Sequence, residues 1–102
     1  PVATVDDVVR ERNLPRVDIL KIDTQGYDLE VLRGAAAQLA ARRVGAVLLE
    51  LNFVPMYERQ ASFPELHALL SGHGYRLVDF YNHQRAAGVT DWCDACYVAP
   101  SP

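Results

Sequence analysis

The stretch KIDTQGYDLEVLRGA, residues 21–35, runs from an apolar strand through a polar corner into an amphipathic helix. The strand is predicted over residues 17–23, where apolar side chains leave few positions for solvent. The helix is predicted from residue 27 or 28, because apolar residues then recur with the 3.6-residue period of one buried stripe. The segment raises a question, since Lys21 and Asp23 place two charges where a buried strand ends.

The chain around this segment alternates helices and strands. Thr4 and Asp7 have the spacing of a capping box, which predicts a helix that ends near Asn13. Residues 44–52 form the most apolar of the predicted strands. Such continuous hydrophobicity is typical of a strand in a parallel sheet that helices cover on both faces.

The last part of the chain predicts one helix and a pair of strands. Ser62 is the expected N-cap of a helix over residues 63–73, and Gly74 follows its end. Strands are expected over residues 75–81 and 94–99, joined by a polar loop that is compatible with an antiparallel pair. This order of elements indicates an α/β fold.

Length and charge limit the classes of function. With 102 residues and a mass of 11.4 kDa, the chain is one domain at most. A net charge of -3 and scattered basic residues argue against nucleic acid and anionic membranes as partners. The longest apolar run is too short to span a bilayer and no secretory signal opens the sequence, so we expect a cytoplasmic protein. Cys93 and Cys96 lack the companions of a zinc site and are expected to be reduced, structural thiols.

Two carboxylates are the first candidates for chemistry. Parallel strands joined by helical crossovers bring their carboxyl ends to one edge of the sheet, where ligands bind in open α/β folds. Asp23 ends one predicted strand, and Glu50 lies near the end of the next. A carboxylate inside so apolar a strand is costly unless it has a partner or a task. Two other interpretations of Asp23 stay open: it caps the following helix, or it forms an ion pair with Lys21.

Several segments, in order along the chain, resemble one known family. KIDTQGYDLEVLRGA resembles the signature segment of the FkbM family of S-adenosylmethionine-dependent methyltransferases, in which a strand ends Lys-Ile-Asp and a helix with Leu-x-Gly-Ala follows. The likeness continues in TVDD (residues 4–7), LELNFVPMYE (49–58), FPEL (63–66), GYRL (74–77) and DACYV (94–98). It covers nearly the whole chain.

The resemblance implies a class I methyltransferase fold, which has a seven-stranded, Rossmann-like sheet. Residues 1–102 would be a single partial domain, the C-terminal half, with strand order 4-5-7-6 and the seventh strand antiparallel. The glycine-rich loop and the acidic residue that hold the cofactor have no counterpart here. We therefore expect this chain alone to be inactive and to bind S-adenosylmethionine weakly or not at all.

The implied reaction of the complete enzyme is O-methyl transfer to the hydroxyl of a small molecule or sugar. Asp23 is the first candidate for the base or acceptor anchor, and Glu50 is the second. If the two held a divalent cation, their oxygens would suit magnesium or calcium, but no metal site is assigned. Gln25 replaces the glutamate that is more common in the family. The residues assigned to substrate binding are Lys21, Thr24, Gln25, Tyr27, Asn52 and Tyr57.

The missing half would also leave surfaces bare. An exposed, apolar edge at residues 17–23 invites pairing with another chain, so we expect a homodimer through this edge or through uncovered helix faces. The alternative function is a non-catalytic, truncated α/β module that serves as an oligomeric scaffold or binding partner.

Overall fold

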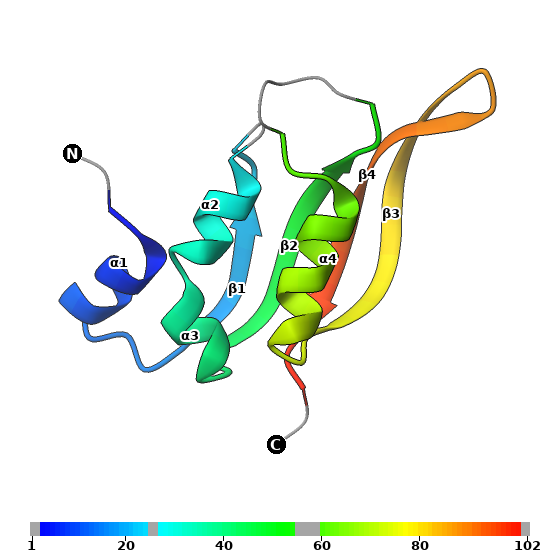
Figure 1. The fold of residues 1–102 in the computed structure, drawn as a ribbon. Helices are drawn as coiled ribbons and strands as arrows, with labels where there is room; N and C mark the ends of the chain where they lie inside the picture. The colour runs from blue at the N-terminus through cyan, green and yellow to red at the C-terminus, as the bar shows by residue number, and fades with distance from the viewer. Residues whose placement is uncertain (1–2, 25–26, 55–59, 101–102) are drawn as a thin grey trace.

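The computed structural model describes residues 3–24, 27–54 and 60–100. It contains a four-stranded mixed sheet with the order β1-β2-β4-β3 (Figure 1). The strands are β1 (Val17–Ile22), β2 (Val44–Asn52), β3 (Arg76–Ala86) and β4 (Val89–Val98). β1 and β2 are parallel, and β4 is antiparallel to both of its neighbours. The predicted α/β class is confirmed.

The helices are α1 (Val5–Glu11), α2 (Asp28–Arg33), α3 (Ala36–Ala40) and α4 (Phe63–Gly72). Both predicted N-caps are confirmed. The Thr4 side chain accepts a hydrogen bond from the backbone of Asp7, and the Ser62 side chain accepts one from Glu65. In each case the acidic side chain also accepts from the N–H of the cap residue, which completes a capping box. No helix among the described residues has the length and apolar composition needed to cross a membrane.

The prediction of a single helix after the polar corner is wrong, because this segment forms two helices, α2 and α3. Gly34 is the C-cap of α2. The carboxylate of Asp6, in α1, accepts hydrogen bonds from the backbone N–H groups of Ala37 at 3.0 Å and Gln38 at 3.2 Å. These are N–H groups of the first turn of α3, which a break would otherwise leave without acceptors. The break is thus stabilised by a residue distant in sequence, and the local 3.6-residue pattern does not reveal it.

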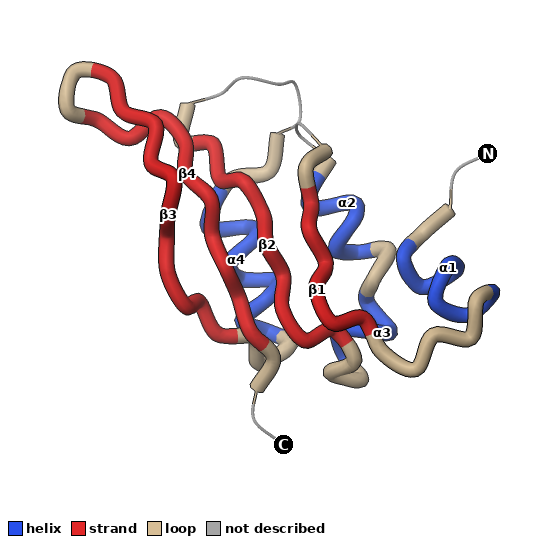
Figure 2. The backbone as a smooth tube through the Cα atoms, turned by 180° about the vertical axis from the view of Figure 1, so that it is seen from behind, coloured by secondary structure: helices blue, strands red, loops and turns tan. Residues whose placement is uncertain are grey.

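The helices α2, α3 and α4 lie together on one face of the sheet (Figures 1 and 2). The hydrophobic core fills the space between these helices and the strands. Its largest fully buried side chains come from both layers: Tyr97, Leu32, Leu39, Leu51, Leu70, Val44, Val47 and Cys93. Both cysteines are free thiols, as predicted, and Cys96 is less buried than Cys93.

The other face of the sheet, here called the open face, has no helix over it among the described residues (Figure 2). Burial alternates along β2, so that Leu49 and Leu51 are buried while Leu48 and Glu50 are partly exposed. The prediction that helices cover both faces of residues 44–52 is therefore wrong for the described part of the chain. The apolar sequence of β2 shows that the strand is central, but it does not show whether this chain supplies both covering layers.

The hairpin of β3 and β4 is longer than predicted. Residues 82–86 and 89–93, expected in a loop, continue the two strands to a turn at Ala87 and Gly88. The φ angles of these two residues are 51° and 78°, and positive φ at both central positions is typical of a type I′ turn. Residues 82–85 are all exposed, because this part of the hairpin extends past the sheet (Figure 1). Without a buried face they lack the alternation that identifies a strand in sequence.

Candidate functional site

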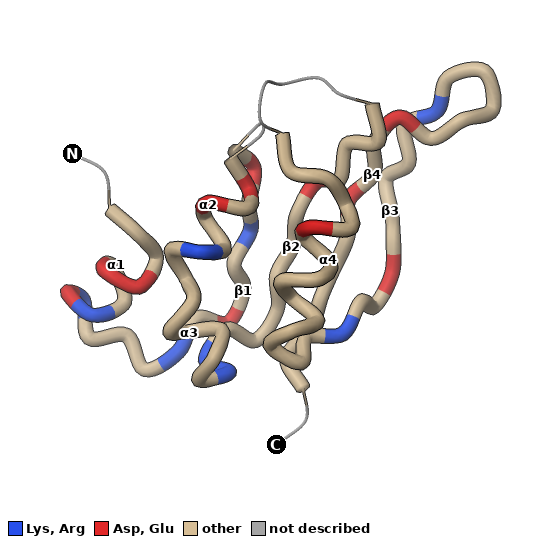
Figure 3. Tube along the Cα trace, in the orientation of Figure 1, with Lys and Arg blue, Asp and Glu red and all other residues tan. Residues whose placement is uncertain are grey.

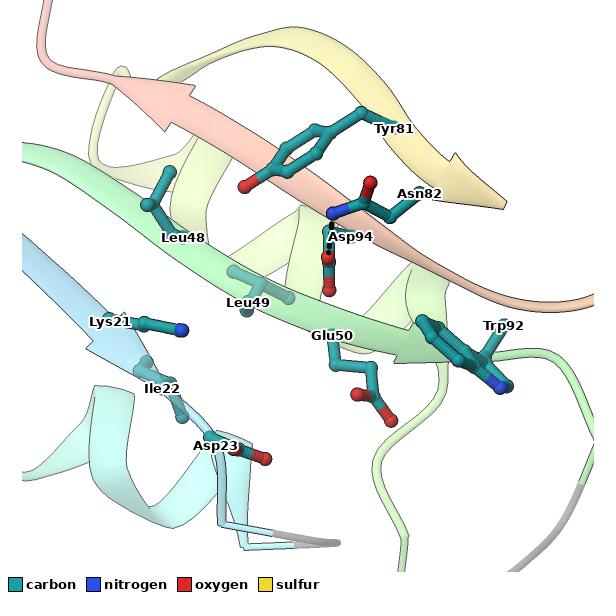
Figure 4. Close-up of a pocket in the computed structure, with 10 residues that line it drawn as sticks. All are labelled: Lys21, Ile22, Asp23, Leu48, Leu49, Glu50, Tyr81, Asn82, Trp92 and Asp94. Atoms are coloured by element: carbon teal, nitrogen blue, oxygen red, sulfur yellow. Dashed lines mark hydrogen bonds between the residues drawn. The ribbon is translucent and has the colours of Figure 1, made fainter. Parts of the chain in front are cut away.

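A hollow of about 280 Å³ lies where β1 and β2 end (Figure 4). The sequence-predicted carboxylates of Asp23 and Glu50 both border it, together with Lys21. The full lining comes from all four strands and the residue after β1: Lys21, Ile22, Asp23, Leu48, Leu49, Glu50, Tyr81, Asn82, Trp92 and Asp94. The hollow therefore joins the strand-end residues that sequence analysis identified to a second group from the hairpin.

Glu50 belongs to a row of residues across three strands. It is the register partner of Asp94 in β4, and Asp94 is the partner of Tyr81 in β3. Like charges directly opposite each other on antiparallel strands destabilise a sheet. Asn82 gives Asp94 a compensating contact, since its Nδ2 donates to Oδ2 of Asp94 at 2.9 Å. The end of β1 and nearby parts of β2 and β4 thus gather negative charge at one end of the sheet (Figure 3).

This environment changes the acidity of Glu50. Burial raises the pKa of its carboxyl group, and the neighbouring charges of Asp23 and Asp94 raise the pKa further, against a hydrogen bond with Asn52 that lowers it. The pKa of Tyr81 is also raised, first by burial and then by the charge of Asp94. A carboxylate whose pKa is shifted toward neutrality is a better proton acceptor than an ordinary one. Glu50 therefore has the electrostatic setting of a general base.

Asp23 and Lys21 are both exposed at this hollow. The interpretation of Asp23 as the cap of the following helix is wrong, because Tyr27 is the N-cap residue of α2, and its side chain forms no capping hydrogen bond in the described structure. The ion pair between Asp23 and Lys21 does not form either, since the described ion pairs lie elsewhere, in α1 and at the start of β1. Both charges thus border the hollow, and neither has an ion-pair partner within residues 3–24, 27–54 and 60–100.

Thr24 serves the start of α2. Its Oγ1 donates to Oδ1 of Asp28 at 2.5 Å. Asp28 is only 7% exposed, and burial raises the pKa of its carboxyl group. Asp28, Glu50 and Asn52 border a second, much smaller hollow. Within the described structure, Oδ1 of Asn52 is buried and has no hydrogen-bond partner.

Tyr27, another of the predicted substrate residues, does not line the main hollow. The Tyr27 side chain is 68% exposed and lines a separate hollow between α2 and the residues that begin α1. Gln25 and Tyr57 lie outside the described residues. The structure therefore brings together Lys21, Asp23 and Glu50 from the sequence-based assignment, with Asn52 beside Glu50.

Sequence reasoning missed the residues that the hairpin contributes, namely Tyr81, Asn82, Trp92 and Asp94. The alternation of apolar and polar residues in β4 could have identified two of them. Cys93 and Ala95 are buried toward the helices, so the alternation of β4 places Trp92 and Asp94 on the open face. The pairing of Asp94 with Glu50, however, depends on the register between strands distant in sequence, which one sequence does not reveal.

The described residues contain neither a cluster of metal ligands nor a glycine loop of the kind that binds a nucleotide. No three or more His, Cys, Asp or Glu side chains lie close enough there to hold a metal ion together. The Gly-x-Gly of Gly72 and Gly74 spans the end of α4, since Gly72 is the last residue of the helix and Gly74 has a φ of 85° that suits a helix end. A dinucleotide-type loop instead joins the end of a strand to the start of a helix. These glycines therefore end α4 and do not form such a loop.

Comparison with known protein families gives a match to the family described as Methyltransferase FkbM domain, over residues 1–77. Searches of curated proteins and of solved structures gave no significant match. The matched residues include Asp23 and Glu50. The hairpin residues at the hollow, Tyr81, Trp92 and Asp94 among them, lie beyond the matched segment.

Proposed function

We propose, from the premise that this chain belongs to the FkbM methyltransferase family, that its hollow is the acceptor side of an S-adenosylmethionine-dependent methyltransferase site. The supporting observation is that Asp23 and Glu50 come from the ends of two parallel, neighbouring strands and border one hollow. Ligands of open α/β sheets bind at this edge. The proposed reaction is methyl transfer to a hydroxyl oxygen of a small molecule or sugar.

The chain's own residues have two tasks in this reaction. The cofactor, when bound, supplies a methyl group that the positive charge of its sulfonium has already activated. The protein therefore has to align the acceptor oxygen and remove its proton. Glu50 is suited to take the proton because its pKa is raised. Asp23, exposed at the same hollow, is suited to orient the hydroxyl. With the cofactor bound, the acceptor oxygen would bond to the methyl carbon as the S–CH₃ bond breaks and its electron pair stays on sulfur. The O–H proton would pass to the carboxylate of Glu50, whose negative charge would thereby be neutralised.

We further propose that residues 1–102 are the C-terminal half of a class I methyltransferase domain. In this interpretation β1, β2, β4 and β3 take the places of strands 4, 5, 7 and 6. The observed order and the antiparallel direction of β4 support this interpretation. The described residues fit an acceptor site but contain no strand-to-helix glycine loop for a nucleotide. Binding of S-adenosylmethionine by this chain alone is therefore expected to be weak or absent.

The activity is tested with the natural full-length polypeptide that contains residues 1–102, by transfer of a labelled methyl group to a panel of hydroxyl acceptors. Glu50→Gln is expected to lower turnover by about 10²–10⁴-fold, the usual contribution of a general base. Asp23→Asn is expected to lower it as well. Asp18→Asn is the matched control, because Asp18 lies on β1 but pairs with Arg16 at 2.8 Å, away from the hollow. Turnover unchanged in all three variants contradicts the proposed roles.

The non-catalytic alternative is favoured by a different observation, the uncovered surface of the sheet. β1 is an edge strand in the described structure, and the Ile19 side chain is 62% exposed. Such an edge is a template for pairing with another chain. If the protein is a non-catalytic scaffold, Glu50→Gln is expected to leave its oligomeric state and its function unchanged. Titration calorimetry measures the affinity of this chain for S-adenosylmethionine. Micromolar binding contradicts the proposal that the chain is half of a methyltransferase domain.

A further inference from the structure

The hairpin adds aromatic surface to the acceptor hollow. Trp92 of β4 and Tyr81 of β3 both line it, and Figure 4 shows Asp94 between the two rings and Glu50 on the side of the hollow toward β1. The ring contacts among the described residues lie in one other cluster, which consists of Phe53, Phe63, His67, Phe80 and Tyr97. Neither Trp92 nor Tyr81 takes part in that cluster. Trp92 is also only partly buried, so it offers an apolar ring surface to a bound molecule.

The polar groups of the hollow are mostly acceptors. Asp94 uses one oxygen to accept from Asn82, and its remaining capacity and the carboxylate of Glu50 are available to hydroxyl donors. Hydroxyl groups that donate to carboxylates form the shorter and stronger class of hydrogen bond. An apolar ring beside two carboxylates thus matches a molecule with an apolar face and a rim of hydroxyl groups.

The charge of the hollow narrows the choice of ligand. Its charged lining residues are one lysine and three carboxylates, a formal net charge of -2. Phosphate and carboxylate ligands are repelled by such a site. The same net charge attracts a cation, and Lys21 offsets only part of that attraction. A protonated amine, however, has no lone pair with which to accept a methyl group, so it is not a methyl acceptor. A neutral ligand is therefore favoured.

We propose that the hollow binds a neutral, polyhydroxylated ring, of the chemical class of a single sugar or cyclitol unit. One face of the ring lies on Trp92, and its hydroxyl groups donate to Glu50 and Asp94. The volume of about 280 Å³ is near the lower end of the range of about 300–1,000 Å³ for small-molecule pockets, which suits one ring. The inference rests on the proposed function in that it names the acceptor class, but binding is measurable without methyl transfer.

Trp92 provides the measurement, because it is the single tryptophan of the chain. The chain is titrated with methyl α-glucopyranoside, methyl α-galactopyranoside and myo-inositol while tryptophan fluorescence is followed. A saturable change with at least one of these three is the expected result. Cyclohexanol, choline chloride and inorganic phosphate are the apolar, cationic and anionic comparisons, and none of them is expected to saturate. No change with any polyol, or saturation with choline or phosphate in their place, overturns the proposal.

Variants identify the groups responsible. Asp94→Asn keeps the side-chain shape and is expected to weaken polyol binding by about tenfold or more, the usual loss for a hydrogen bond to a charged group. Asp79→Asn is the matched control, since Asp79 lies on the adjacent strand, accepts a hydrogen bond from the N–H of Phe80 at 2.8 Å and does not line the hollow. Equal weakening by both variants overturns the assignment.

Trp92→Ala is expected to weaken binding by about tenfold, because the ring no longer covers the ligand's apolar face. Trp92→Phe keeps an apolar ring and is expected to retain most of the affinity, with both variants measured by calorimetry since the fluorophore is lost. Circular dichroism checks that each variant is folded. Full affinity in folded Trp92→Ala overturns the role of the ring.

The binding and activity experiments have distinguishable failures. Polyol binding that depends on Trp92, without methyl transfer by the full-length polypeptide, contradicts the proposed function and leaves the ligand class intact. Methyl transfer to an acceptor whose affinity is the same in the Trp92 and Asp94 variants contradicts the ligand class and leaves the function intact.

Discussion

Replacing Glu50 by glutamine is predicted to stabilise the protein at pH 8. Glu50 lies directly opposite Asp94 in the β2–β4 pair, and its pKa is raised first by burial and then by the charges of Asp23 and Asp94. Glutamine keeps the shape of the side chain and removes the repulsion. A like-charge cross-strand pair costs about 0.2–1 kcal/mol. In a domain of this size, about 1 kcal/mol corresponds to a change in Tm of about 4–8 °C.

The sign of the pH dependence provides the stricter test. Because the pKa of Glu50 is raised in the folded state, the folded protein takes up a proton before the unfolded chain does as pH falls. The ionised carboxylate of Glu50 lowers the free energy of unfolding by its full amount above the raised pKa. This loss of stability disappears as pH falls through the raised pKa toward the ordinary pKa of 4.5. The stabilising effect of Glu50→Gln is therefore expected to be largest at pH 8 and close to zero at pH 4.

Thermal unfolding followed by circular dichroism at pH 8 and pH 4 measures both quantities. Asp18→Asn is the control, because it removes an exposed carboxylate whose partner is Arg16, and such pairs are worth about 0–1 kcal/mol. It is expected to leave stability unchanged or slightly lower. If Glu50→Gln lowers Tm at pH 8, or raises it equally at both pH values, the like-charge account of this site is refuted.

Three further predictions concern the scaffold. Asp6→Ala removes the acceptor for the backbone N–H groups of Ala37 and Gln38, so urea unfolding should show a loss of about 1 kcal/mol, as for other helix caps, while an unchanged midpoint contradicts the capping role. Ala87→Gly relieves a residue held at a φ of 51°, and it is predicted to raise Tm by an amount equivalent to about 0.5–1 kcal/mol; a lower Tm contradicts the turn assignment. The homodimer expected through the edge of β1 predicts a dimer in sedimentation equilibrium that Ile19→Lys dissociates, and a monomer at every concentration tested contradicts it.

Features that depend on local chemistry were predictable from the sequence. The caps at Thr4 and Ser62 follow from side chains placed next to the backbone groups that they bind. The strand at residues 44–52 was evident because its apolar run has no competing pattern. The signature around Asp23 gave the family, which the match over residues 1–77 confirms.

Features that depend on contacts between distant segments were not predictable in the same way. Asp6 reaches α3 across more than thirty residues, so the helix break has no local signal. Because parallel strands have their carboxyl ends at one edge of the sheet, the sequence predicted that Asp23 and Glu50 lie at the same edge. Asp94 lies beside them only because of the register between β2 and β4. The long hairpin was hidden because its exposed residues follow no burial pattern.

The strand order has a consequence for how the chain acquires its structure. Of the four described strands, β4 is the last to be synthesised, yet it lies between β2 and β3 and joins β3 to the other two. On the ribosome, β3 has no sheet partner until residues 89–98 have emerged. Closing these non-local pairs is slow relative to forming helices, so the growing chain exposes apolar strand surface until residues 89–98 have emerged. A stop codon just before residue 89 would therefore do more than shorten the sheet at its edge, because it would remove the strand that lies between β2 and β3.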